Sequence, residues 1–140
     1  FERGFKALDL MIVAAAISLC IIFAVPARED YAVRTKLSEA LSVAQDAKTA
    51  IAITCAESPN LDFLDNHSAG FTMQKAAYVR SVEVDGPCSH PKIHVYTTNT
   101  GARTDPVLTI SGVMEVRTHR HHWVCEGDVS NDQLPESCRR

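Results

Sequence analysis

Five cysteines are the residues whose types and spacing most clearly suggest chemistry in this chain of 140 residues: Cys20, Cys55, Cys88, Cys125 and Cys138. No two of them form a Cys-x-x-Cys pair, so disulfide chemistry is favoured over metal or redox chemistry. Cys20 lies in an apolar run, where a cysteine serves as a small apolar residue. The other four allow three pairings. Spacing favours Cys125 with Cys138, because a short loop costs less entropy to close, and this leaves Cys55 with Cys88.

Histidines form a second group of candidate ligands, in the run Thr118-His119-Arg120-His121-His122-Trp123. In a strand, His119 and His121 share one face, and two imidazoles can bind a divalent ion. No acidic or thiol partner adjoins this run, so a surface histidine cluster is favoured and no metal site is predicted. The same histidines could form a local basic patch at mildly acidic pH with Arg117, Arg120, Arg139 and Arg140, which weakly indicates DNA contact.

Asp9 is the most informative single residue, because it stands in front of sixteen uncharged residues, Leu10 to Val25, of which only Ser18 is polar. Such a run spans roughly 24 Å as a helix, close to the ~30 Å hydrocarbon core of a bilayer. An ionised acid in hydrocarbon costs several kcal/mol unless it is paired, so Asp9 is a candidate functional residue. The alternative is that Asp9 lies at the headgroup level and is simply solvated.

A secretory signal peptide is the competing interpretation of this run, and two features disfavour it. The stretch Ala24-Val25-Pro26-Ala27-Arg28 is a poor cleavage site, and the flank before the apolar core should be basic rather than acidic. A membrane segment is therefore favoured, which places the later cysteines outside the cytoplasm.

The elements that must position these residues follow from periodicity. Beyond Pro26, apolar residues recur every three or four positions to about Ala56, so one helix from Phe5 to Ala56 is predicted, with Pro26 as a kink. A polar loop follows from Glu57 to about Gln74. Four strands then alternate with turn signals: Tyr78 to Val84, Lys92 to Thr98, Val107 to Val116 and His119 to Cys125. The predicted fold class is α+β, with a four-stranded antiparallel sheet packed on the helix.

Composition and motifs exclude several classes of function. A net charge of −3 gives no overall attraction to nucleic acid or anionic lipid. The sequence has no nucleophile elbow, no phosphate-binding loop and no paired acids in a plausible cleft. It therefore predicts a protein that is not an enzyme and that needs no cofactor. The triplet Asn66-His67-Ser68 matches a glycosylation acceptor, but this signal is unreliable.

Both ends of the chain resemble the type IV pilins. The segment Gly4-Phe5-Lys6-Ala7-Leu8-Asp9-Leu10-Met11-Ile12-Val13 is similar to the prepilin cleavage site and N-terminal motif of that family, and the likeness continues through Pro26. Trp123-Val124-Cys125, with Leu134-Pro135 and Cys138, is similar to the disulfide-bounded C-terminal loop of Pseudomonas-type (type IVa) major pilins. This chain departs from the pattern at Asp9, where the family has glutamate, and at Ser18, where glycine is common.

The resemblance implies a role for each part of the chain. A prepilin peptidase would cut between Gly4 and Phe5, and the new Phe5 amine would be methylated, so that residues 1–4 are a leader remnant; processing before Phe1 is the alternative. Residues 5–25 would form the transmembrane and filament-core half of the helix, and residues 26–140 the globular domain. Asp9 would pair with an N-terminal amine, of its own chain or of a neighbouring subunit, and Asp9 and Pro26 would serve assembly.

The implied function is that of a structural subunit of a type IV pilus. Its partners would be other copies of itself in a helical filament, the inner membrane before assembly, the prepilin peptidase and assembly machinery, host or abiotic surfaces, and weakly DNA. Adhesion, twitching motility and DNA uptake are the associated activities. The alternatives are a pseudopilin or minor pilin, and a membrane-anchored binding domain that never polymerises.

Overall fold

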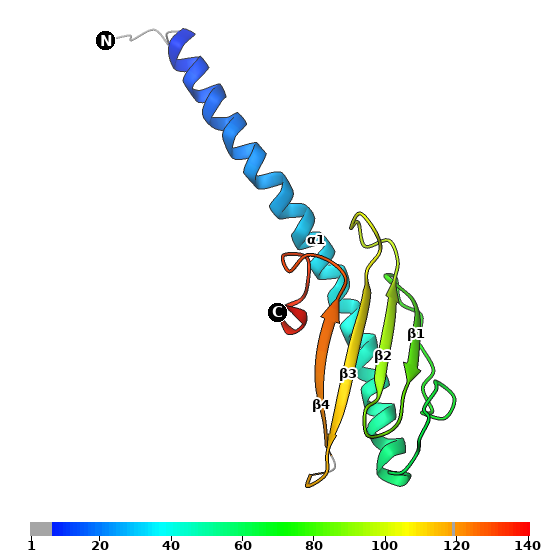
Figure 1. The fold of residues 1–140 in the computed structure, drawn as a ribbon. Helices are drawn as coiled ribbons and strands as arrows, with labels where there is room; N and C mark the ends of the chain where they lie inside the picture. The colour runs from blue at the N-terminus through cyan, green and yellow to red at the C-terminus, as the bar shows by residue number, and fades with distance from the viewer. Residues whose placement is uncertain (1–6, 119) are drawn as a thin grey trace.

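The chain begins with one long helix, α1, that spans Ala7–Glu57. The computed structural model of the chain describes residues 7–118 and 120–140. Helix α1 has 51 residues and continues through Pro26 without a break. Its first half extends away from the rest of the molecule, and its second half lies against the sheet (Figure 1). The predicted helix is confirmed, although the predicted start at Phe5 lies outside the described residues.

A single stripe of α1 packs against the sheet. The buried residues follow a spacing of three and four: Val33, Leu37, Ala40, Ala44, Ala47, Ile51 and Cys55. Three alanines in the middle of this stripe let the helix backbone approach the sheet closely, because they add little side-chain volume. Tyr31, which precedes this stripe, lies outside it and is 67% exposed. Leu41, Val43 and Ala50 only flank the core.

The sheet has four antiparallel strands in the order β1-β2-β3-β4. The strands are β1 (Val79–Asp85), β2 (Lys92–Thr97), β3 (Val107–Glu115) and β4 (Arg120–Gly127). Alternate residues of the central strands are fully buried, such as Ile93, Val95, Leu108 and Ile110, which face the helix stripe. The predicted α+β fold is therefore confirmed, with strand ends that differ by up to two residues.

A long loop, residues 58–78, connects α1 to β1 and packs closely against both. Leu64, Ala69 and Phe71 are buried. The side chain of Asn66 bonds to the outer edge of β1: its Nδ2 donates to the Val82 carbonyl and its Oδ1 accepts from the Val84 amide, each at 2.7 Å. Because β1 is an edge strand, Asn66 satisfies backbone groups that would otherwise remain free for pairing with another chain. Asn66, the asparagine of the glycosylation triplet, therefore has a structural role in holding the loop to β1.

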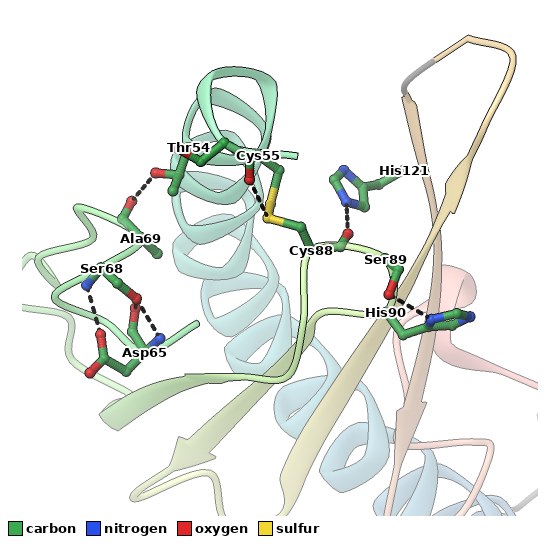
Figure 2. The surroundings of a disulfide bond; sticks show 10 residues. Thr54, Cys55, Asp65, Ser68, Ala69, Cys88, Ser89, His90 and His121 are labelled. Atoms are coloured by element: carbon green, nitrogen blue, oxygen red, sulfur yellow. Dashed lines mark hydrogen bonds between the residues drawn. A yellow bond between two sulfur atoms is a disulfide. The ribbon is translucent and has the colours of Figure 1, made fainter. Parts of the chain in front are cut away.

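Two disulfides close the fold, Cys55–Cys88 and Cys125–Cys138, and this is the pairing that the spacing favoured. Cys55–Cys88 links the last turns of α1 to the connection between β1 and β2 (Figure 2). At the same place the Cys88 carbonyl accepts a hydrogen bond from His121 Nε2 at 2.8 Å. The end of the helix, the β1–β2 connection and the edge strand β4 are thus joined at Cys88.

Candidate functional site

The first half of α1 is the most unusual surface of the molecule, because its apolar side chains are exposed. Leu8, Met11, Ile17, Ile22 and Phe23 are all at least half exposed, and Phe23 reaches 73%. The most apolar window of 18 residues in α1 has a mean hydropathy of 2.7 and none of it is buried. By length and composition, α1 could cross a membrane, and it is the one such helix among the residues that the structure describes. A surface of this kind requires an apolar environment.

Polar groups within this helix half are few and are placed at favourable positions. Asp9 lies in the first described turn, where the helix dipole favours a negative charge. The Ser18 hydroxyl donates to the Ala14 carbonyl at 2.8 Å, so it needs no partner outside the helix. Pro26 lies within α1, 17 positions after Asp9 (26 − 9 = 17). Gly4 and Phe5, the predicted processing and methylation site, lie outside the described residues.

The C-terminal loop is closed by the Cys125–Cys138 disulfide and is ordered by its own contacts. Leu134 is buried against Gly127 of β4, where the lack of a side chain makes room for it. The Leu134 carbonyl accepts from Arg139 Nε at 3.0 Å, and a short 3₁₀ helix, η1 (Glu136–Cys138), completes the loop. These contacts hold the C-terminal loop against the end of β4.

The same loop is also fastened to α1 and to the sheet. Arg34 Nη2 donates to the Asp132 carbonyl, and Gln133 Nε2 donates to Asp30 Oδ1 at 3.0 Å. On the other side, Asp128 Oδ1 accepts from the Val107 amide at 2.8 Å. The loop therefore holds the C-terminal segment to the fold, while Asn131 and Asp132 at its tip stay exposed. The loop can therefore fasten the C-terminal segment to the fold and also present exposed residues to a partner.

The histidine run divides between the two faces of β4. His121 lies on the helix side, where its ring packs on Trp123 with centroids 5.4 Å apart. His122, as the next residue in the strand, is exposed on the other face. His119 lies outside the described residues. Within residues 7–118 and 120–140 there is no group of three or more His, Cys, Asp or Glu side chains placed to hold a metal ion.

The four arginines expected in one basic patch lie at two ends of β4. Arg117 and Arg120 lie at the β3–β4 turn, whereas Arg139 and Arg140 follow η1 at the other end of the strand. Arg140 is also neutralised by an ion pair with Glu126, at 2.8 Å. The expectation of a single patch was wrong, because the Cys125–Cys138 disulfide holds Arg139 and Arg140 near the last residues of β4, at the end opposite the β3–β4 turn.

Several contact residues were not identified from the sequence. Asp30 and Arg34, which hold the C-terminal loop, are polar helix residues beside the buried stripe, and their spacing of four places them on one face. Lys48 is another polar helix residue beside the buried stripe, and its Nζ lies 5.7 Å from the centroid of the Trp123 ring. Helical periodicity indicates such flanking positions, but it does not indicate which segment covers them.

The globular part of the chain matches a known protein family. The family described as Pilin (bacterial filament) matches residues 33–139. This match covers the second half of α1, the sheet and the C-terminal loop. It is therefore based on the globular part and is independent of the N-terminal likeness.

Individual relatives extend the likeness to the rest of the chain. The fimbrial protein EcpC of Eikenella corrodens is 29% identical over 142 aligned positions, covering 99% of this chain and 91% of the relative. The fimbrial protein of Neisseria meningitidis serogroup B is 36% identical over 89 positions, covering 59% of this chain and 50% of the relative. The type IV major fimbrial protein FimA of Dichelobacter nodosus is 45% identical over 51 positions, 36% of this chain and 32% of the relative.

Proposed function

The chain belongs to the pilin family, as a type IV pilin, and from this premise we propose that the exposed apolar half of α1 is its assembly element. The protein is a structural subunit of an extracellular pilus filament and not an enzyme. The observation that carries the proposal is the helix surface from Leu8 to Val25, whose large apolar side chains have no partner within the described residues of the chain. Copies of the same helix are the partners that a homopolymer offers.

Burial drives the proposed assembly. Apolar surface removed from water stabilises by about 25 cal/mol per Å². In the subunit before assembly the bilayer of the inner membrane would cover this surface, and in the filament the neighbouring helices would cover it instead. The proposed division of the chain is into residues 5–25 as the membrane and filament-core half, residues 26–140 as the globular part, and residues 1–4 as a leader remnant.

Asp9 is the proposed register residue of the filament. A carboxylate within a packed apolar core needs a positive partner, and a free N-terminal amine of this or a neighbouring subunit supplies one. Cleavage between Gly4 and Phe5 by the prepilin peptidase would create that amine, four residues before Asp9 (9 − 5 = 4). Pro26 would mark the boundary where the helix leaves the core.

The proposed contacts of the assembled filament involve its outer surface. The C-terminal loop presents the exposed Asp132 side chain, which is suited to polar contacts with host or abiotic surfaces, whereas the Asn131 amide bonds to the main chain of Arg140. Adhesion, twitching motility and weak contact with DNA are proposed on the family relationship. The abundance implied by the name of the Dichelobacter nodosus relative supports a role as the major subunit.

The substitution Asp9→Ala tests the proposal. We expect the variant to leave the globular domain folded and to abolish filaments, because the amine would lose its partner inside the core. Electron microscopy of sheared filaments measures assembly, while circular dichroism and the mass of the oxidised chain report folding and both disulfides. The matched control is Asp9→Glu, which keeps the charge and should keep filaments. Normal filaments from Asp9→Ala would contradict the pairing.

A further inference from the structure

A pocket of about 280 Å³ lies between the second half of α1 and the edge strand β4. Gln45, Lys48 and Thr49 line it from the helix, and Arg120, His121 and Trp123 line it from the strand. The set combines cationic side chains with an amide and a hydroxyl, and no acidic residue lines the pocket. Neither the assembly element nor the C-terminal loop contributes to it.

Lys48 carries a positive charge that has no carboxylate partner at contact distance. Across residues 7–118 and 120–140, the one ion pair within 4.0 Å is Arg140 with Glu126, at the far end of β4. Partial burial lowers the pKa of the Lys48 ammonium, because desolvation disfavours the charged form. The Trp123 ring lies beside this charge, with its centroid 5.7 Å from Lys48 Nζ, and it carries no formal negative charge. An anion in the pocket would supply the missing charge.

Arg120 is also available to such an anion. Its cross-strand partner is Glu115, whose carboxylate accepts a hydrogen bond from Thr118 Oγ1 at 2.8 Å. Glu115 and Arg120 do not form an ion pair within 4.0 Å in the described part of the chain. The guanidinium offers several donors in a planar fork, which suits the oxygens of phosphate better than a single donor does.

The neighbouring groups hold the pocket in shape. His121 Nε2 donates to the Cys88 carbonyl at 2.8 Å, so His121 is held against the β1–β2 connection and forms one wall of the pocket (Figure 2). Cys88 is fixed in turn to α1 by its disulfide with Cys55. Trp123 lies against Gly112 of β3, where an added Cβ would come within 2.8 Å of the ring. Because Gly112 and Lys48 flank the indole, Trp123 positions Lys48 rather than offering a free surface for stacking.

We propose that this pocket binds a phosphate-type oxyanion, either free phosphate or the phosphodiester of a polymer, through Lys48 and Arg120. The Gln45 amide adds a neutral donor from the helix side, whereas the Thr49 hydroxyl already donates to the Gln45 carbonyl at 2.9 Å. Several donors converge from two elements, which matches a tetrahedral anion with oxygens in several directions. The pocket is formed by the second half of α1 and by β4, and not by the assembly element, so binding can be measured on the unassembled subunit.

Trp123 is the only tryptophan of the chain, so its fluorescence reports directly on the pocket. The experiment titrates inorganic phosphate into the full chain in a nonionic detergent, at constant ionic strength set with chloride. We expect a saturable fluorescence change in the millimolar range, and a loss of affinity of about tenfold or more in Lys48→Gln and in Arg120→Gln. Lys92→Gln is the matched control, since it removes an equal charge from exposed Lys92 on β2, outside the pocket.

A second arm identifies the source of the phosphate. A short thymidine oligonucleotide is compared with inorganic phosphate at equal phosphate concentration. Tighter binding of the oligonucleotide that also needs Lys48 and Arg120 indicates a phosphodiester polymer as the ligand. Equal or weaker binding of the oligonucleotide indicates free phosphate. Either result supports the pocket. The proposal is overturned if phosphate gives no saturable change, if chloride alone reproduces the change, or if both substitutions leave the affinity as in Lys92→Gln. Filament microscopy of the same variants separates a failure of this pocket from a failure of assembly.

Discussion

At the scale of a single residue, the Asp105 side chain holds the loop between β2 and β3 in shape through hydrogen bonds. The loop between β2 and β3 includes Asn99 and Gly101, with φ angles of 54° and 87°. The Asp105 carboxylate accepts from the Thr100 amide and hydroxyl, each at 2.9 Å, and from the Asn99 amide at 3.1 Å. These bonds, those of Thr100 first, lower the pKa of Asp105, with a smaller contribution from the charge of Arg80. The ionised form of Asp105 therefore stabilises this loop.

The substitution Asp105→Asn should destabilise the fold in a pH-dependent way. A carboxyl group whose pKa is lowered by folding contributes stability above its unfolded pKa, which is about 3.9 for aspartate, and loses it as the pH falls through the folded value. We expect a lower urea midpoint for Asp105→Asn at pH 7, because an amide nitrogen cannot accept the bonds of one carboxylate oxygen. The difference should shrink at pH values below the unfolded pKa. Asp62→Asn, at an exposed site in the 58–78 loop, is the control; an equal loss at all pH values in Asp105→Asn would contradict the role of the charge.

Among elements, the helix and the strands could be predicted, because their signals are local and periodic. The spacing from Val33 to Ile51 predicts a buried helix stripe, and alternation predicts each strand to within two residues. Contacts between elements could not be predicted in the same way. The bonds of Asn66 to β1, and the pocket between Lys48 and β4, depend on how a loop and an edge strand lie over the helix. No local pattern encodes that arrangement.

The two disulfides stabilise different pairs of elements, and their removal should have different effects. Cys55–Cys88 closes a separation of 33 residues and Cys125–Cys138 one of 13. Loop-closure entropy predicts stabilisation of about 4 kcal/mol for the first and about 3 kcal/mol for the second. We expect the double substitution Cys55→Ala/Cys88→Ala to cause the larger loss in denaturant unfolding. It should also change Trp123 fluorescence, because the Cys88 carbonyl holds His121 beside that ring.

Removal of the second bridge, by Cys125→Ala/Cys138→Ala, serves as the comparison. It should release the C-terminal loop from β4 and leave the end of α1 in place. Mass measurement of the unreduced chain confirms which bridge remains in each variant. A larger loss from the second pair than from the first would show that native contacts, and not the entropy of the unfolded chain, dominate the contribution of these bridges.

The molecule as a whole consists of a packed globular part and of a helix half that packs against nothing else among the described residues. The second half of α1, the sheet and the loops share one core, whereas the first half of α1 extends beyond it (Figure 1). None of the residues from Leu8 to Val25 is buried in the subunit. The helix half thus contributes to the stability of an assembly or a membrane-bound state, and not to that of the isolated fold. Its removal should leave the globular part intact.

A chain of residues 29–140 should therefore be soluble without detergent, monomeric and cooperatively folded, with both disulfides formed. We expect sedimentation to give a monomer and urea unfolding to give a single transition. The matched variant, residues 37–140, removes a further two turns of helix that hold buried Val33, Arg34 on the Asp132 carbonyl and Asp30 on Gln133. It should lose about 2 kcal/mol or more, because a buried apolar side chain, the two contacts with the C-terminal loop and the Lys36 Nζ bond to the Asn99 carbonyl are lost together. If residues 29–140 failed to fold while the full chain in detergent folded, the first half of α1 would have a role within the subunit that its exposure does not suggest.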